Sequence, residues 1–319
     1  MDNNLLTIRF RNFPDKKIYP YFLELLELST GEKPYIVEDI NKNVDLEITG
    51  PYAGVNEIYK TPLIKRVKRY GYIKFTNGGH LKRKDLAVGI QPLKTAKKNI
   101  WFTGENQRPP QGNWDGYLSF DTNLPDDRCV YFPLWFITST DLFDSTKKSY
   151  WDGNVPSISE LIDGREFTKQ KRFFASSFIG KSYSMRLHAL EELAKIGKVD
   201  VFGESVRRKV QSPAKIAERY RFVMCFENDI YPGYITEKPI EAYLTGAIPL
   251  YYGLDSSGFL NSSATINLND FKNIHDWINR IKQVENDLIL YQEIYEKPIL
   301  LKKPTLRDAI KLINKILNS

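Results

Sequence analysis

The chain has 319 residues, of which 42% are hydrophobic, 27% charged and 13% aromatic. This length corresponds to about two domains, and the composition excludes a disordered, collagen-like or disulfide-scaffold protein. Lys and Arg exceed Asp and Glu by 46 − 39 = 7, a surplus that suits either an anionic partner or a solvated basic surface.

Short strands alternate with a helix in the first part of the chain. LLTIRF (5–10) and VDLEITGP (44–51) have the pattern of strands, and the apolar spacing of YPYFLELLEL (19–28) predicts a helix between them. NIWFTG (99–104) and GYLSFD (116–121) are further strand-and-turn segments. This alternation favours an α/β domain with a parallel sheet.

Residues 140–168 are rich in Ser, Asp, Gly and Lys, the composition of a linker or a long loop. We place the domain boundary near the end of this stretch. The sequence therefore predicts an N-terminal α/β domain over 1–165 and a C-terminal domain over 166–319.

The second half of the chain again alternates strands and helices. RFFASSF (172–178) is strand-like, and MRLHALEELAKIG (185–197) is an amphipathic helix that ends at glycine. YRFVMCFEN (220–228), TEKPIEAYLTG (236–246) and AIPLYYG (247–253) then read as strand, helix and strand. Two such α/β halves predict a two-lobed protein that binds ligands at the carboxyl ends of its strands, in the cleft between the lobes.

The C-terminal tail predicts an amphipathic helix with Lys and Arg on the opposite face. Its apolar face comprises Leu306, Ala309, Ile310, Ile313, Ile316 and Leu317. The tail and the basic runs at 63–71 and 80–85 could contact an anionic membrane peripherally. The alternative, which we favour, is that the runs are solvated and the tail packs on the core.

Several absences narrow the chemistry. No apolar run approaches the roughly 18 residues of a membrane span, and MDNNLLTIRF lacks the pattern of a secretory signal. Cys129 and Cys225 are too few for a disulfide framework and predict reduced thiols in a cytoplasmic protein. HExxH, GxSxG, GxGxxG and Asp-x-Asp are absent and the three histidines lie far apart in the sequence, so we predict no metal site.

One segment resembles a P-loop. The stretch from Ala175 to Gly180, Lys181 and Ser182 lies between a predicted strand and a predicted helix, with Ala in place of the first Gly of that motif. No apolar strand ending in Asp follows at the distance that magnesium binding requires. A P-loop nucleotide-binding protein stays open as an alternative, as does simple phosphate binding by a strand-to-helix turn.

The strongest polar cluster runs from Phe226 to Lys238, after an apolar strand and into the start of a helix. The carboxylate of Glu237 could accept a ribose hydroxyl, while Lys238 and the free amides of the helix could bind a phosphate. The alternative is that Glu237 and Lys238 form a solvated capping turn.

This region resembles a known family. FENDIYPGYITEKPIEAYLTGAIPLYYG (226–253) is similar to the signature segment of the alpha-1,3-fucosyltransferases, glycosyltransferase family ten. KRFFASSF and MRLHALEELAKIGKVDVFG resemble the segment upstream of it, and NIWFTGEN, DGYLSFD and YFPLWF resemble the N-terminal domain. Gly180-Lys181 and Pro239 depart from the family's pattern. The membrane anchor of the animal relatives is not seen, which points to a bacterial-type enzyme in the cytoplasm or at the inner membrane face.

The resemblance implies a GT-B fold, in which two Rossmann-like domains face a central cleft. The N-terminal domain would bind the acceptor and the C-terminal domain GDP-L-fucose. An inverting transfer would move L-fucose to a hydroxyl, typically O3, of GlcNAc or glucose in an oligosaccharide or glycolipid. The resemblance implies no required cofactor, with a divalent metal at most stimulating the reaction.

Such a transfer needs a base for the acceptor proton and cations for the departing GDP. The resemblance implies that Glu105 is the base; the alternative is a surface turn carboxylate. It also implies a set of donor-binding residues. These are Arg186, Asn228, Tyr234, Glu237 and Lys238. In this set Arg186 and Lys238 would neutralise the diphosphate. Glu237 would bind the ribose, and Tyr234 and Asn228 would shape the nucleotide pocket.

Three other functions remain as alternatives. A different GDP-sugar could be the donor on the same scaffold, and the P-loop reading predicts magnesium-dependent ATP or GTP binding. A nucleic-acid-binding module would use the basic runs and aromatic residues, but no RNA-binding signature is present, so we predict no nucleic-acid partner.

Overall fold

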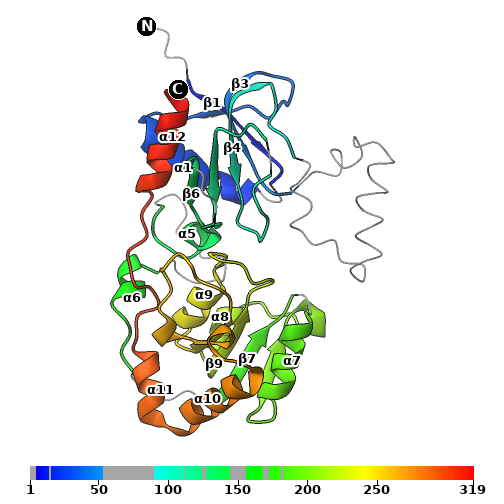
Figure 1. Ribbon diagram of the computed structural model, residues 1–319, viewed down its shortest axis with the longest axis vertical. Coiled ribbons are helices and arrows are strands. Elements are labelled where there is room, and N and C mark those ends of the chain that lie inside the picture. The colour runs from blue at the N-terminus through cyan, green and yellow to red at the C-terminus, as the bar shows by residue number, and fades with distance from the viewer. Residues whose placement is uncertain are drawn as a thin grey trace. The chain divides into compact units, whose positions relative to one another are not determined.

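The computed structural model describes residues 5–13, 16–52, 90–110, 112–123, 127–143, 156–167, 172–180 and 183–319. The chain forms two compact units (Figure 1). Unit 1 comprises Met1–Pro133 together with Thr305–Ser319, and unit 2 comprises Leu134–Pro304.

Unit 1 contains a parallel sheet with the strand order β2-β1-β3-β4-β5-β6 among its described residues. The strands are β1 (Thr7–Arg11), β2 (Tyr35–Ile36), β3 (Val44–Thr49), β4 (Ala96–Phe102), β5 (Gly116–Ser119) and β6 (Cys129–Tyr131). The predicted strands and the helix α1 (Tyr19–Thr30) are confirmed. Strands β2 and β6, which we did not predict, are too short to show alternation.

Helix α12 (Arg307–Leu317) packs in unit 1, where it contacts α1, β5 and β6 (Figure 1). Its apolar face is buried, and a side chain at Gly116 of β5 would place Cβ 2.6 Å from Ile316 Cδ1. The amphipathic pattern is therefore explained by packing on the core, and the apolar face is not available to lipid. The basic runs at 63–71 and 80–85 lie outside the described residues.

Unit 2 contains a second parallel sheet with the order β11-β10-β9-β7-β8. Its strands are β7 (Phe173–Phe178), β8 (Val199–Phe202), β9 (Tyr220–Phe226), β10 (Ile248–Tyr252) and β11 (Ile266–Asn267). Its helices are α5 (Leu134–Thr138), α6 (Ile158–Ile162), α7 (Ser184–Leu193), α8 (Pro213–Ala217), α9 (Lys238–Leu244), α10 (Ile274–Asn286) and α11 (Leu288–Tyr295). Every residue of the central strand β9 is buried, which is why its sequence is a continuous apolar run rather than an alternating one.

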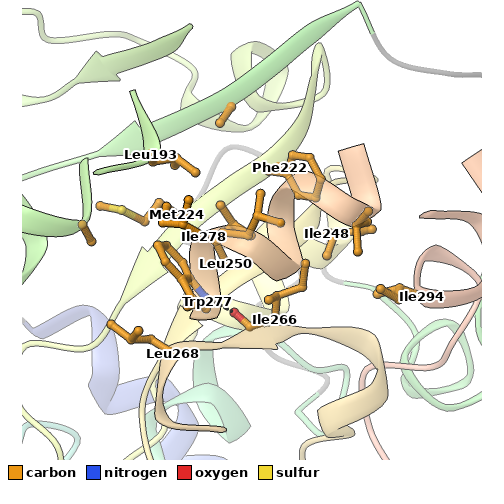
Figure 2. Packing of buried hydrophobic residues seen from close by; sticks show 14 of the residues in the cluster. Leu193, Phe222, Met224, Ile248, Leu250, Ile266, Leu268, Trp277, Ile278 and Ile294 are labelled. Carbon is orange, nitrogen blue, oxygen red and sulfur yellow. Dashed lines mark hydrogen bonds between the residues drawn. The ribbon is translucent and has the colours of Figure 1, made fainter. Parts of the chain in front are cut away.

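One face of this sheet packs against α7 and α10 (Figure 2). Phe222 and Met224 of β9, Leu250 of β10 and Trp277 of α10 belong to one buried cluster. The indole Nε1 of Trp277 donates a hydrogen bond to the carbonyl oxygen of Ile266 at 3.0 Å, so this fully buried ring has its one polar atom satisfied. The core thereby fixes β9, whose carboxyl end carries the polar cluster.

The units divide the chain at 133/134 and 304/305, whereas the sequence placed a single boundary between 165 and 166. Arg165 shows why the segment before 166 packs in unit 2. Its Nε donates to Tyr295 O and its Nη2 to Ala247 O, both at 2.8 Å. Its guanidinium lies between the rings of Tyr243 and Tyr295, 4.0 and 3.9 Å from their centroids. These partners lie on α9, α11 and the turn before β10, far from Arg165 in the sequence.

Candidate active site

Glu227 organises the polar cluster at the carboxyl end of β9. It follows the last residue of the strand, and its side chain is fully buried. Its Oε1 accepts hydrogen bonds from Thr236 N at 2.8 Å and from Tyr251 Oη at 3.3 Å. Thr236 Oγ1 lies 2.9 Å from both carboxylate oxygens. A buried carboxylate with this many hydrogen-bond donors fixes the groups around it.

Lys238, the first residue of α9, is held by this cluster. Its Nζ donates to Glu227 Oε2 at 2.9 Å and to Thr236 Oγ1 at 2.8 Å. Burial acts to lower the pKa of Lys238, but the carboxylates of Glu227 and Glu237 outweigh it and raise that pKa above its usual value. Lys238 is therefore a fixed cation, and part of its charge is already compensated by Glu227.

Arg186 reaches the same end of β9 from the first turn of α7. Its Nη2 donates to Phe226 O at 2.8 Å and contacts Asn228 Oδ1 at 3.4 Å. The side chain lies over the ring of Tyr183, 5.3 Å from its centroid. Burial lowers the pKa of Arg186, and the surrounding groups, Glu227 among them, oppose that effect. A guanidinium remains charged under such conditions, so it supplies a second cation here.

The remaining predicted donor-binding residues lie in the loop between β9 and α9. Asn228 is exposed, whereas Tyr234 is almost fully buried. Glu237 precedes α9 with helical backbone angles (φ −63°, ψ −21°), and its side chain makes no capping hydrogen bond. This geometry argues against a simple capping turn, because an N-cap residue normally has extended angles and a bonded side chain. The structure thus brings five of the six predicted residues together in unit 2.

The sixth, Glu105, lies in unit 1 in the turn after β4. Thr103 Oγ1 donates to Glu105 O at 2.8 Å and accepts from Glu105 N at 3.2 Å. The hydroxyl of Tyr52 donates to Glu105 Oε1 at 2.6 Å. The side chain of Glu105 is half-buried and hydrogen-bonded. It therefore differs from the solvated turn carboxylate that was the alternative. A carboxylate held in this way can accept a proton from a hydroxyl in a fixed direction.

Sequence reasoning singled out the Phe226–Lys238 stretch but assigned no role to Glu227 or Tyr251, and it gave Thr236 only the role of a helix cap. A signal for Glu227 was present, because an acid directly after a wholly apolar strand needs a buried partner. No comparable signal marked Tyr251, since its hydroxyl meets Glu227 only through the pairing of β10 with β9.

Within the described residues there is no group of three or more His, Cys, Asp or Glu side chains that could hold a metal ion. In the same part of the chain, no helix combines the length and the apolar character needed to cross a membrane. Lys181 and Ser182 of the P-loop-like segment lie outside the described residues.

Glu241 of α9 provides a prediction about pH. Its carboxyl group is buried and its Oε1 has no hydrogen-bond partner. Burial, followed by the nearby Glu237 carboxylate, raises the pKa of Glu241 well above its usual value. The folded chain therefore holds this proton more tightly than the unfolded chain. Stability is full below the unfolded pKa and falls as pH rises through that value towards the folded one.

We expect Glu241→Gln to remove this dependence and to raise the free energy of unfolding at pH 8, because the amide cannot ionise and so carries no charge that burial penalises. Urea unfolding at pH 5 and pH 8 measures the effect, and Glu293→Gln, exposed on α11, is the matched control. An equal difference between variant and parent at both pH values would contradict the assignment.

Comparison with known proteins gives a consistent result. Residues 168–297 match the family model described as glycosyltransferase family 10 (fucosyltransferase) C-term. "Alpha-(1,3)-fucosyltransferase FucT" of Helicobacter pylori is 27% identical over 252 residues, which cover 67% of this chain and 52% of that protein. "4-galactosyl-N-acetylglucosaminide 3-alpha-L-fucosyltransferase FUT6" of Pan troglodytes is 32% identical over 218 residues, covering 63% of this chain and 54% of that one. The chain spans about half the length of these curated relatives.

The fold has solved counterparts. A crystal structure of an alpha1,3-fucosyltransferase matches with a TM-score of 0.66 at 22% identity and covers 100% of this chain and 92% of that one. A structure of an alpha1,3-fucosyltransferase with GDP-fucose matches with the same TM-score at 20% identity, covering 99% and 91%. The predicted α/β class with the GT-B fold is thereby confirmed. Residues 168–297 are therefore similar to the C-terminal domain of the fucosyltransferases of glycosyltransferase family 10, and the whole chain shares the fold of the solved alpha1,3-fucosyltransferases.

Proposed function

We propose that this protein is an inverting fucosyltransferase that moves L-fucose from GDP-L-fucose to a hydroxyl, typically O3, of GlcNAc or glucose in an oligosaccharide or glycolipid. The observation that carries the proposal is the pair of held cations, Arg186 and Lys238, at the carboxyl end of β9 in the family-matched unit. The names of the relatives, and the GDP-fucose in a structure of the same fold, support this donor.

The two cations suit a nucleotide diphosphate. Arg186 can grip phosphate oxygens with two N–H groups, while Lys238 acts as a point charge. Both are positioned before a ligand arrives, Arg186 by Phe226 O and Lys238 by Glu227 and Thr236. Charges fixed in advance stabilise the negative charge that develops on departing GDP without reorganisation in the transition state. In this proposal Glu237 binds the ribose, and Asn228 and Tyr234 shape the nucleotide pocket.

The proposed reaction is a displacement at the anomeric carbon. The acceptor oxygen forms a bond to that carbon while the bond to the GDP oxygen breaks, and the sugar becomes oxocarbenium-like between the two. Glu105 takes the acceptor's proton, so the new glycosidic oxygen is neutral and the bond's electron pair leaves with GDP. Attack from the face opposite the leaving group inverts the configuration.

Thermal unfolding in the presence of candidate donors tests the donor directly. We expect GDP and GDP-fucose to stabilise the protein equally in magnesium and in EDTA, whereas UDP-galactose does not. A ligand at 100 times its Kd adds about 2.7 kcal/mol, which corresponds to a shift of roughly 4–8 °C, the larger value applying if unit 2 unfolds by itself. Lys238→Met should abolish most of the shift, and Lys215→Met, on the short helix α8, is the matched control.

Two results would contradict the proposal. Stabilisation by ATP only with magnesium would support the P-loop alternative and move attention to the segment 175–182. An equal or larger shift with GDP-mannose, together with its turnover on an acceptor, would keep the family scaffold but replace fucose as the transferred sugar.

A further inference from the structure

A tyrosine from a different part of unit 1 holds the carboxylate of Glu105. Tyr52 lies in the turn after β3, 53 residues before Glu105, and its hydroxyl donates to Glu105 Oε1 at 2.6 Å. This is a short hydrogen bond to a carboxyl oxygen, the kind that contributes most to orientation. Tyr52 lies outside both the family-matched segment and the sequence motifs.

The backbone of Tyr52 is fixed to the end of β1. Gly50 N donates to Arg11 O at 2.8 Å, and Tyr52 N donates to Asn12 O at 3.1 Å. Asn12 has a left-handed φ of 60°, a conformation that Asn tolerates. A Cβ at Gly50 would lie 2.7 Å from Asn12 O, so only glycine allows this close approach. The phenol is therefore presented from a rigid turn.

Glu105 is held from its other side by its own turn. Thr103 Oγ1 bonds both Glu105 O and Glu105 N, and Gln107 N donates to Glu105 O at 2.6 Å. These bonds fix the backbone of Glu105, but they leave rotation about its side-chain bonds open. The Tyr52 hydroxyl restrains that rotation, because it holds one of the two carboxylate oxygens at 2.6 Å.

We infer that Tyr52 is a positioning residue for proton transfer in the transferase reaction, an inference that rests on the proposed role of Glu105 as base. A base works only when its lone pair points at the proton that it takes, and small misplacements slow the reaction strongly. Tyr52 performs no transfer itself. It holds Glu105 in one rotamer, ready for the acceptor hydroxyl.

Tyr52→Phe is the direct test, because it removes the hydroxyl and keeps the ring. We expect kcat to fall roughly tenfold to a hundredfold, the effect of losing one hydrogen bond to a charged group. The KM for GDP-fucose and the affinity for GDP should not change. Tyr35→Phe is the matched control, since Tyr35 lies in the same unit with its side chain 60% exposed.

A double-mutant cycle separates positioning from a structural role. If Tyr52 acts through Glu105, Tyr52→Phe causes no further loss of kcat in a Glu105→Gln background. Equal losses in both backgrounds, or an unchanged kcat in Tyr52→Phe when Glu105→Gln alone is impaired, would overturn the inference. An unimpaired Glu105→Gln would instead overturn the proposed base, so the two failures are distinguishable.

Discussion

Glu105→Gln is expected to lower the transfer rate by about two to four decades, the usual contribution of a general base, without weakening GDP binding. The amide cannot take the acceptor's proton, but its oxygen can still accept the hydrogen bond that Tyr52 donates. The turn formed with Thr103 uses backbone atoms of Glu105 and stays intact. Initial rates with GDP-fucose and an N-acetyllactosamine acceptor, together with calorimetric titration of GDP, measure the two quantities separately.

Glu32→Gln is the control for this experiment, because Glu32 is exposed just after α1 in the same unit. It should leave both the rate and GDP affinity unchanged. Transfer at the parent rate in Glu105→Gln would remove Glu105 from the role of base. A loss of GDP affinity that matches the loss of rate would assign it to donor binding.

The second large effect concerns stability. Glu47 of β3 is fully buried between two buried arginines of β1, and its carboxylate oxygens lie 2.7 Å from Arg9 Nε and 2.7 Å from Arg11 Nε. Glu47→Ala removes the buried carboxylate that both guanidinium groups contact. We expect the free energy of unfolding of unit 1 to fall by about 3–5 kcal/mol, the usual cost of breaking a buried ion pair from one side.

Hydrogen exchange of the β1 and β3 amides measures this loss locally, which matters because a chain with two units need not unfold in one step. Glu38→Ala removes a highly exposed partner of Lys16 and should leave exchange unchanged, since solvated pairs contribute little. Exchange rates in Glu47→Ala equal to those of the parent would show that water or local rearrangement compensates the arginines.

Most of the helices and strands could be predicted from the sequence, but few of the contacts between them could. Strand β9 was predictable because a run of buried residues can only be a central strand or a buried helix, and its short length favoured the strand. We named the candidate site residues on the loop after β9 from the resemblance of 226–253 to the family's signature segment. The partners of Arg165 could not be predicted, because α9, α11 and the turn before β10 converge on it only in the folded chain.

Two domains were predicted, but the boundary that we placed differs from the division into units for a similar reason. The composition of 140–168 predicted a linker or a long loop, and the helix α6 lies within that stretch, because composition carries no information on which neighbour a segment packs against. The tail helix illustrates this most clearly: its apolar stripe required a partner, and periodicity could not tell a core from a membrane. Its partners are α1 and β5, more than 180 residues earlier.

The return of α12 to unit 1 bears on how the protein is made. On the ribosome, residues 305–319 appear only after the whole of unit 2 has been synthesised. Until then β5, β6 and α1 expose the apolar surface that α12 covers in the finished fold. Unit 2 is continuous in sequence and can complete its sheet first, although it is encoded second. Premature termination before α12, soon after residue 304, would thus leave a complete unit 2 attached to an incompletely covered, aggregation-prone sheet.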